Sequence, residues 1–509
     1  MIQQVDDSRR LVVPRWRPFR VAAGLGLLDS PGKPPVPKPS SGELEEVQAD
    51  WRRHRSPFHA ANLVDLAVVL NRPEIATDAA VFIASSGNSA LPEFELARFV
   101  LSNMDRPISA TPPDLSPSTR FRRIAEARRS LRRQPRNPIL IVDLARDYSS
   151  LGQKDPAERA LQRAVLFAPH SRFVLRAASR FFLHAGRPDE AHAVVRRVHK
   201  AKADPWLLAA EIVAAAAAGR DSRWINLARE LIDGGAFEPS HITELASALG
   251  TIEHANGNIR GVKRLFKHAL VEPTENSVAQ AAWVSRHMSS FEVPESSLTV
   301  PRAFEAKAWS AAIGQRYETA VELSWAWLRD EPFATRAALF GAGVASVALG
   351  DFQTGAELAS IARLANRDDP RLIVELIYCL ASQDKIDDAE SLLLTDLPRA
   401  VSRRPGIMSD VSLRVIETAD HGLIAFRRGD FPNGRRFYER AILFAREAGS
   451  DVLAASALLH FLREEARANL TADLPWEQAR QALKAFPPNT RPFYERFLGR
   501  IPTLRAGSR

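Results

Sequence analysis

The chain has 509 residues, of which 45% are hydrophobic and 25% are charged, and its formal net charge is +9. This composition is typical of a folded protein and excludes a chain that is disordered or fibrous throughout. A single compact core stops growing at roughly 250 to 300 residues, so this length requires several domains or a repeat array. The basic excess is modest and does not by itself indicate a nucleic-acid partner.

The sequence predicts a cytoplasmic protein. Its apolar runs are shorter than the roughly 18 to 20 residues that a membrane-spanning helix needs. The arginines before residues 21–28 resemble a signal peptide, but Asp6, Asp7 and the missing cleavage site disagree with one. The single cysteine, Cys379, excludes an internal disulfide and agrees with a reducing compartment. The preference for arginine over lysine indicates a bacterial origin.

Residues 1–43 are predicted to be a flexible tail. Residues 9–20 hold five arginines around Trp16, and residues 31–42 are rich in proline, serine and lysine. Such a segment buries too little apolar surface to offset the entropy lost on ordering. The sequence leaves open whether this tail occupies a groove elsewhere in the protein.

Residues 44–136 are predicted to form an N-terminal helical region. Leu63, Leu66 and Leu70 share one helical face, and the prolines of residues 111–118 indicate a linker.

From Asn137 onward the sequence repeats. Several of the intervals between turn residues are close to 34 residues, which is typical of a helical repeat. The turn residues are Gly152, Gly186, Gly219, Gly257, Gly314, Gly350, Asp384 and Gly429. The first unit has one apolar stripe before its turn and small residues after it, followed by a proline. These residues are Ile141, Leu144, Ala145, Tyr148, Gly152, Ala157, Leu161, Ala164 and Pro169.

This order of residues resembles the tetratricopeptide (TPR) family. The resemblance implies an all-α fold, a right-handed superhelical solenoid of helix-turn-helix repeats. Residues 137–450 would contain about eight units, some of them degenerate. Residues 44–136 and 451–509 would form helical N- and C-terminal caps.

Two intervals are too long for one unit, the interval from Gly257 to Gly314 and the interval from Asp384 to Gly429. We expect either an extra helix, as residues 276–291 indicate, or insertions near residues 294–301 and 398–405. A small residue follows most turns at a fixed distance. Ala320 is an exception, because it follows Gly314 one residue late.

No motif indicates catalysis. Gly341-Ala342-Gly343 lies inside a predicted helix without a preceding strand, so it is a poor dinucleotide fingerprint. The histidines lack the spacing of a metal pair, and one cysteine cannot build a thiolate zinc site. We therefore expect a non-enzyme without cofactor or metal. The weakest alternative is a small enzymatic domain in the first hundred residues, with Asp65, Asp78 or His59 as its reactive groups.

The resemblance also implies a binding groove, because the first helix of each TPR unit lines the concave face. It places a basic and aromatic set of residues there, suited to a carboxylate or a phosphate. These residues are Arg146, Phe173, Arg176, Arg180, Leu183, His184 and Trp206. Beyond them, Ala209 and Val213 give an apolar floor on which an apolar segment could lie. The structural alternatives are that Asp143 and Glu211 pair with the arginines, and that the floor is helix packing.

A second candidate surface is the helix predicted at residues 120–136, which has eight arginines and one glutamate. Its periodicity directs four arginines largely toward solvent, as contacts for phosphate or an acidic partner. They are Arg122, Arg129, Arg132 and Arg133. The alternative is a solvated face of a capping helix.

The leading hypothesis is a scaffold or adaptor that binds a segment of a partner protein in its groove. One alternative is a nucleic-acid-associated subunit that uses the arginine-rich N-terminal region. Another is a regulatory partner of a separately encoded effector enzyme. No membrane partner is expected, and the sequence leaves the partner and the oligomeric state open.

Overall fold

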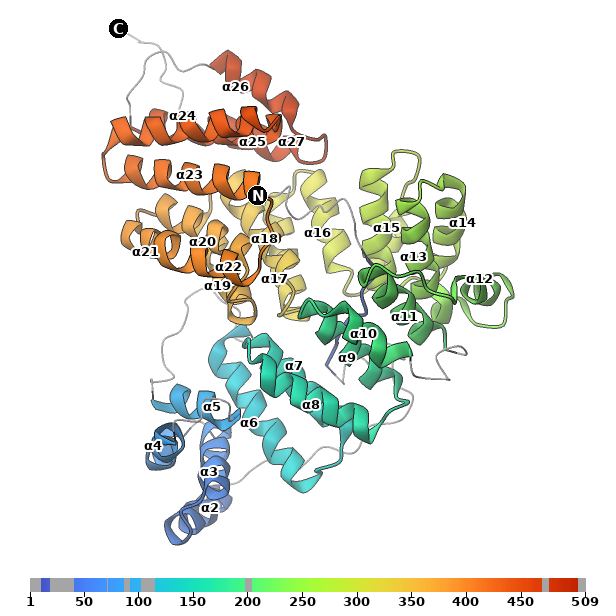
Figure 1. Ribbon diagram of the computed structural model, residues 1–509. Coiled ribbons are helices and arrows are strands. Elements are labelled where there is room, and N and C mark those ends of the chain that lie inside the picture. The colour runs from blue at the N-terminus through green and yellow to red at the C-terminus, as the bar shows by residue number, and fades with distance from the viewer. Residues whose placement is uncertain are drawn as a thin grey trace. The chain divides into compact units, whose positions relative to one another are not determined.

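The computed structural model describes residues 11–18, 41–70, 72–86, 92–101, 115–196, 204–468 and 476–501 (Figure 1). All regular secondary structure in these ranges is helical, which confirms the predicted all-α class. The tail up to residue 10 and from 19 to 40, and residues 111–114 of the predicted linker, lie outside the described residues. By its contacts the chain divides into two compact units.

The N-terminal body comprises the described residues of 9–303 together with residues 330–333. Its helices are α2 (Ser41–Arg53), α3 (Pro57–Val69), η2 (Pro73–Ala76), α4 (Thr77–Ser85), α5 (Pro92–Leu101), α6 (Pro117–Arg133), α7 (Pro138–Ser150), α8 (Lys154–Phe167), α9 (Arg172–His184), α10 (Pro188–Arg196), α11 (Pro205–Ala217), α12 (Ile225–Asp233), α13 (Pro239–Ala255), α14 (Ile259–Ala269), α15 (Glu275–His287) and η5 (Glu295–Thr299).

The hairpin of α7 and α8 shows how the local sequence builds one repeat. Asn137 caps α7 by accepting hydrogen bonds from two backbone amides of the first turn, and Pro138 occupies the first helical position. Gly152 has a φ of 72°, a left-handed conformation that glycine adopts without a steric penalty. Ala157 and Ala164 of α8 are completely buried, and their small side chains let α8 approach α7 closely. The hairpin therefore has the register that the TPR resemblance predicts.

The core of the N-terminal body continues through α13, α14 and α15. Leu245, Phe266 and Trp283 belong to one buried cluster to which these three helices contribute. Burying each such side chain fully contributes about 1.5 to 3 kcal/mol. Helix α15 is the extra helix expected at residues 276–291, and with η5 it accounts for the long interval after Gly257.

The C-terminal body comprises residues 304–329 and the described residues from 334 onward. Its helices are α16 (Phe304–Ile313), α17 (Tyr317–Asp330), α18 (Thr335–Gly343), the π-helical turn η6 (Val344–Leu349), α19 (Phe352–Ala365), α20 (Pro370–Ser382), α21 (Ile386–Ser391), the π-helical turn η7 (Leu392–Asp396), α22 (Leu397–Arg403), α23 (Asp410–Arg427), α24 (Phe431–Glu447), α25 (Asp451–Arg467), α26 (Trp476–Ala482), η8 (Leu483–Ala485) and α27 (Arg491–Gly499).

Two of these helices lie where the repeat pattern is irregular or ends. Helix α22 falls within the insertion expected near residues 398–405 and accounts for the long interval before Gly429. Helix α27 was not expected from the sequence. It packs on η6, and the ring of its Phe493 lies 5.6 Å from the ring of Tyr317.

The turn between α16 and α17 corrects one sequence prediction. Gln315, and not Gly314, has the positive φ, which is 57°. Ala320 then follows its turn residue by the same five positions that separate Gly152 from Ala157. Ala320 seemed to come one residue late only because Gly314 was taken as the turn residue in place of Gln315.

Packing accounts for the glycine of the Gly341-Ala342-Gly343 run in α18. A Cβ atom at Gly341 would lie 2.5 Å from Cβ of Ser324 on α17. Close helix packing thus requires glycine at position 341. The run lies inside a helix, as predicted, and has the role of a packing contact, not of a dinucleotide-binding loop.

The corrected turn assignment predicts that replacing Gly429 and Gly314 by alanine changes the free energy of unfolding of the C-terminal body by different amounts. Gly429 has a φ of 82° and open space around it, so Gly429→Ala should destabilise this body by about 1 kcal/mol through backbone strain alone. Gly314→Ala should change the free energy of unfolding by less than about 0.5 kcal/mol, because its Cβ would make only ordinary contacts. Urea denaturation followed by circular dichroism measures both. An equal loss in the two variants would contradict the corrected turn.

Candidate functional site

Residues 11–18 form neither helix nor strand and lie against the N-terminal body, alongside α9 and α15 (Figure 1). Arg15 is 7% exposed, and Trp16 and Arg17 are each 1% exposed. These residues fall within the predicted flexible tail. They are buried because the guanidinium groups of Arg15 and Arg17 and the indole of Trp16 contact acids and aromatic rings that are distant in the sequence.

Both arginines of the segment form buried ion pairs. Arg17 Nη2 lies 2.7 Å from Oε1 of Glu275, and the other end of the guanidinium contacts the carboxylate of Asp330. Arg15 pairs with Glu331. Burial lowers the pKa of Arg17, and the nearby carboxylate of Glu275 opposes this effect. A buried charge of this kind is tolerated only when it is paired.

The indole of Trp16 lies in an aromatic cage. Its ring centroid is 6.3 Å from that of Phe181, edge to face, and 5.4 Å from that of Phe333. Arg146 Nε donates a hydrogen bond of 3.1 Å to the carbonyl oxygen of Trp16, and Arg146 Nη2 donates one of 2.8 Å to the carbonyl of Asp330. Arg146 thus recognises the main chain of the segment.

The N-terminal end of the segment is apolar. Val12 is 4% exposed and belongs to the same buried cluster as Ala209 and Val213, the floor predicted for the third repeat. Asn276 Nδ2 donates a hydrogen bond of 3.1 Å to the carbonyl of Val13. We call the residues that contact the polar and aromatic part of the segment the segment-binding surface. They are Arg146, Phe181, Glu275, Asn276, Asp330, Glu331 and Phe333.

The predicted groove residues lie in this part of the body, and among them Arg146 donates a hydrogen bond to the segment. Arg180 lies over the ring of Phe333 at 5.0 Å, and the ring of His184 is 5.6 Å from the same ring. Phe173 is buried and Leu183 is half-buried.

Arg176 forms a pair with an acid, as the structural alternative expected, but with a different acid. Its Nη2 lies 2.7 Å from Oε2 of Glu244, and its guanidinium lies 4.9 Å from the ring centroid of Trp206. Glu211 instead interacts with His192 at 3.0 Å and accepts a hydrogen bond from Ser222 at 2.6 Å.

Sequence reasoning missed the acidic side of the surface. Glu275 and Asn276 open α15, and Asp330, Glu331 and Phe333 lie outside the repeat units to which the groove was assigned. The only available signal was charge complementarity, since two arginines in the tail require acids if they are buried.

The arginines of α6 differ in their surroundings. Arg122 is exposed, and Arg133 Nη2 lies 3.1 Å from Glu43. Arg129 was expected to face solvent but is 6% exposed and pairs with Glu43. Arg132 pairs with Asp65. Three of the four predicted phosphate contacts therefore already have acidic neighbours.

The three residues of the enzymatic alternative have structural contacts in separate places. Asp65 is completely buried and pairs with Arg128 and Arg132; burial raises its pKa and the two guanidinium groups oppose the rise. Asp78 accepts a hydrogen bond of 3.1 Å from Trp51 Nε1, and His59 lies 2.7 Å from the hydroxyl of Ser56. In the described part of the chain, no cluster of side chains could hold a metal ion.

The hairpins, their turns and their small buried residues define a helical-repeat fold of the tetratricopeptide type. No family profile and no curated protein matches the chain. Among solved structures, the chain is similar to the Cut9–Hcn1 hetero-tetramer of the APC/C, with 12% identity, a TM-score of 0.36, and coverage of 89% of this chain and 92% of that chain. It is also similar to yeast Tom70, with 13% identity, a TM-score of 0.31, and coverage of 89% and 96% respectively. These are distant likenesses, and the class is defined by the helices themselves. None of the described helices is both long and apolar enough to cross a bilayer.

A set of buried titratable groups lies in the C-terminal body. Glu375 is completely buried and accepts a hydrogen bond of 3.0 Å from Ser346, and Cys379 Sγ lies 3.8 Å from the same carboxylate. Asp420 is 5% exposed, and its Oδ2 has no hydrogen-bond partner among the described residues. Burial and, secondarily, the negative charge of Glu375 raise the pKa of Asp420 well above its usual range. The enclosure of this set indicates a structural role.

The raised pKa of Asp420 makes the C-terminal body less stable at high pH. The folded state keeps the proton at pH values where the unfolded state, with a pKa of about 3.9, has released it, so the stabilisation present at low pH is lost as the pH rises through the folded-state pKa. Asp420→Asn cannot ionise. Relative to wild type, it should therefore gain at least about 1 kcal/mol between pH 5 and pH 8.5 in urea titrations. Asp388→Asn, at an exposed site on α21, is the matched control, and the same gain there would contradict the assignment.

Proposed function

We propose that the protein is a non-catalytic scaffold that binds an extended segment of a partner protein on the segment-binding surface. The observation that supports this proposal is the burial of residues 11–18 there by ion pairs, aromatic contacts and a main-chain hydrogen bond. Stacked helical repeats form extended concave surfaces that can hold such a segment. A site that holds such a segment within its own chain has the chemistry to hold one from another chain.

The surface selects a segment with an aromatic residue between two basic residues. Glu275, Asp330 and Glu331 offer three carboxylates to two positive charges. Phe181 and Phe333 offer ring faces and edges to a planar side chain. An acidic segment would leave these carboxylates buried beside like charges.

We extend the proposed site to the neighbouring residues of the groove. Arg176, Arg180 and Trp206 are carried by the first helices of the second and third repeats, as is Arg146 in the first repeat. Phe173, Leu183 and His184 lie on the same helix as the two arginines. These side chains would contact a partner segment that runs beyond the stretch covered by residues 11–18.

Residues 11–18 must leave the surface before a partner can bind. A segment tethered to its own site is present at an effective concentration in the millimolar range, so a competing partner binds with a correspondingly lower apparent affinity. We place this exchange in the cytoplasm, where the buried thiol of Cys379 remains reduced.

The proposal predicts that weakening the internal segment opens the surface. A fluorescein-labelled peptide with the sequence of residues 11–18 should bind the full-length Trp16→Ala/Arg17→Ala variant at least about tenfold more tightly than wild type in fluorescence anisotropy, because the variant segment loses its cage and its ion pairs. A peptide in which both arginines are alanine should bind at least about tenfold more weakly.

A second substitution locates the site. Glu275→Gln in the Trp16→Ala/Arg17→Ala background should reduce peptide affinity by at least about tenfold, since one buried charge pair is lost. Glu272→Gln, an exposed position three residues earlier, is the matched control and should have no effect. Circular dichroism verifies equal helicity. Equal affinity for wild type and for all variants would reject the segment-binding surface as the binding site.

A further inference from the structure

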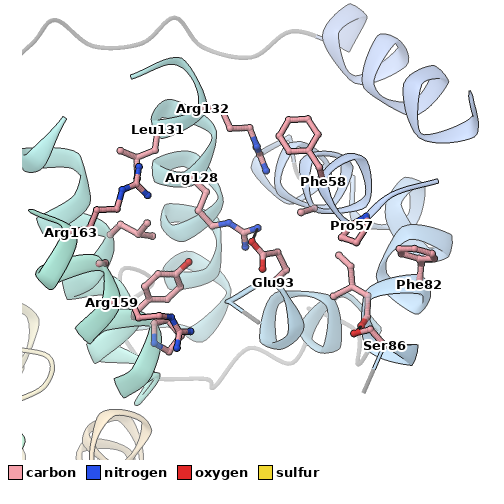
Figure 2. Close-up of a pocket in the computed structure, with 16 residues that line it drawn as sticks. Pro57, Phe58, Phe82, Ser86, Glu93, Arg128, Leu131, Arg132, Arg159 and Arg163 are labelled. Carbon is pink, nitrogen blue, oxygen red and sulfur yellow. Dashed lines mark hydrogen bonds and ion pairs between the residues drawn. The ribbon is translucent and has the colours of Figure 1, made fainter. Parts of the chain in front are cut away.

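A pocket of about 550 Å³ lies between the N-terminal helices and the first repeat (Figure 2). Helices α3 and α4 form one side, and α6, α7 and α8 form the other. The volume lies within the range of roughly 300 to 1,000 Å³ that small-molecule sites occupy. It is separate from the segment-binding surface, with which it shares no residue.

One wall of the pocket is apolar. Pro57, Phe58, Phe82 and Ile83 line it from α3 and α4, and Leu144 adds an apolar side chain from α7 on the other side. The side chain of Phe58 is 62% exposed, so apolar surface of the pocket extends to solvent. An exposed large aromatic ring at the edge of a concave site is typical of a place where an apolar ligand body is covered.

The polar lining is strongly basic. Its charged residues are four arginines and one glutamate, Glu93, and Ser86 and Tyr148 add two hydroxyl groups. Figure 2 shows Arg128 and Glu93 between the helix that carries Phe58 and the helix that carries Arg159 and Arg163. The arginine excess favours an anion.

Arg128 and Arg132 bring two guanidinium groups of α6 to the pocket, and the side chain of Arg132 is 23% exposed. The side chain of Arg128 is 9% exposed; its Nη2 lies 2.8 Å from Glu93 and its Nε lies 3.3 Å from Asp65. The Nη1 atoms of Arg128 and Arg132 have no hydrogen-bond partner among the described residues. These two Nη1 atoms are enclosed, so the pocket attracts an oxyanion through the net positive charge of its arginines.

The structural alternative is that these arginines serve only to neutralise Asp65. Asp65 pairs with Arg128 and Arg132, so it accounts for part of their charge. It does not account for the positive charge of Arg159 and Arg163 at the same pocket, nor for the open volume beside the apolar wall. A buried carboxylate requires partners but does not require a cavity.

We propose that this pocket binds a small anionic amphiphile, a carboxylate or phosphate head group attached to a hydrocarbon or aromatic body. The head group lies beside the guanidinium groups of Arg128 and Arg132, with Arg159 and Arg163 adding positive charge. The body lies against Phe58, Phe82 and Ile83.

The test uses the full-length protein and decanoate, below its micelle concentration, in isothermal titration calorimetry. Wild type should bind one equivalent of decanoate. Decanol, which has the same chain length without the charge, and acetate, which has the charge without the chain, should each bind at least about tenfold more weakly, because each lacks one of the two contacts.

Three variants assign the site. Arg132→Gln and Phe58→Asp should each reduce decanoate affinity by at least about tenfold. Phe58 is largely exposed, so its substitution tests the site even if Arg132→Gln disturbs the fold. Arg72→Gln, an exposed arginine outside the pocket, is the matched control and should bind like wild type. The proposal is overturned if decanoate fails to bind wild type, or binds Phe58→Asp and Arg72→Gln equally.

A vesicle experiment separates two sources of the same chemistry. Co-sedimentation of wild type with phosphatidylglycerol vesicles, lost in Phe58→Asp and prevented by decanoate, would assign the ligand to a membrane lipid. Decanoate binding without co-sedimentation would assign it to a free amphiphile. Co-sedimentation that neither Phe58→Asp nor decanoate changes would contradict a role of this pocket in vesicle binding.

Discussion

At most turns, the close approach of the paired helices depends on a small side chain five residues after the turn residue; Trp224 and Val262 are the exceptions. Ala157, Ala191, Ala320 and Ala389 occupy this position and are all completely buried. Where glycine replaces alanine, the partner helix comes closer still: a Cβ at Gly434 would lie 2.5 Å from Cδ2 of Phe426. Close packing of this kind leaves no room for a larger residue, and each hairpin then buries its remaining apolar stripe against the next. The first helices of successive repeats are thereby held side by side.

The first helices of the repeats also carry buried charged groups into their shared face. Arg146 and Arg176 are each at most 5% exposed and carry charge into the packed region, where backbone carbonyls and Glu244 satisfy them. Glu275 and Asp330 are satisfied in turn by Arg17, which comes from another part of the chain. Removing the segment without a replacement would take the guanidinium of Arg17 away from buried Glu275, which is costly, whereas Asp330 would keep Arg302 at 3.4 Å. The surface therefore favours exchange of one basic segment for another over an empty state.

The sequence predicted the parts of this structure that local interactions determine. The helix pairs, most turn residues and the extra helix α15 follow from periodicity, caps and small residues within about 34 positions. The failures all involve distant contacts or a misleading local residue. Gly314 was assigned as the turn residue, although Gln315 has the left-handed conformation. Helix α27 was not predicted, because contacts distant in sequence, such as that of Phe493 with Tyr317, stabilise it.

The candidate site divides in the same way. Arg146 was identified because its position within a repeat is fixed by the register. Glu275 was not identified, because it pairs with a residue 258 positions away and nothing in its own neighbourhood distinguishes it from a surface glutamate at the start of a helix. The segment itself was assigned to a flexible tail for the same reason. The proline-, serine- and lysine-rich residues 31–42 decided that assignment, and only the acids and rings of the repeats make burial of the two arginines favourable.

Helix α7 places the two binding regions on opposite sides of one rigid element. Arg146 contacts the segment, whereas Leu144 and Tyr148 line the pocket. Residues two positions apart on an α-helix point in nearly opposite directions, so one helix serves an acidic and aromatic surface on one face and a basic pocket on the other. The two regions therefore select ligands of opposite charge, and a ligand suited to one is excluded from the other by electrostatic repulsion. Substitutions outside α7, such as those at Glu275 or Phe58, change one region and leave the other intact.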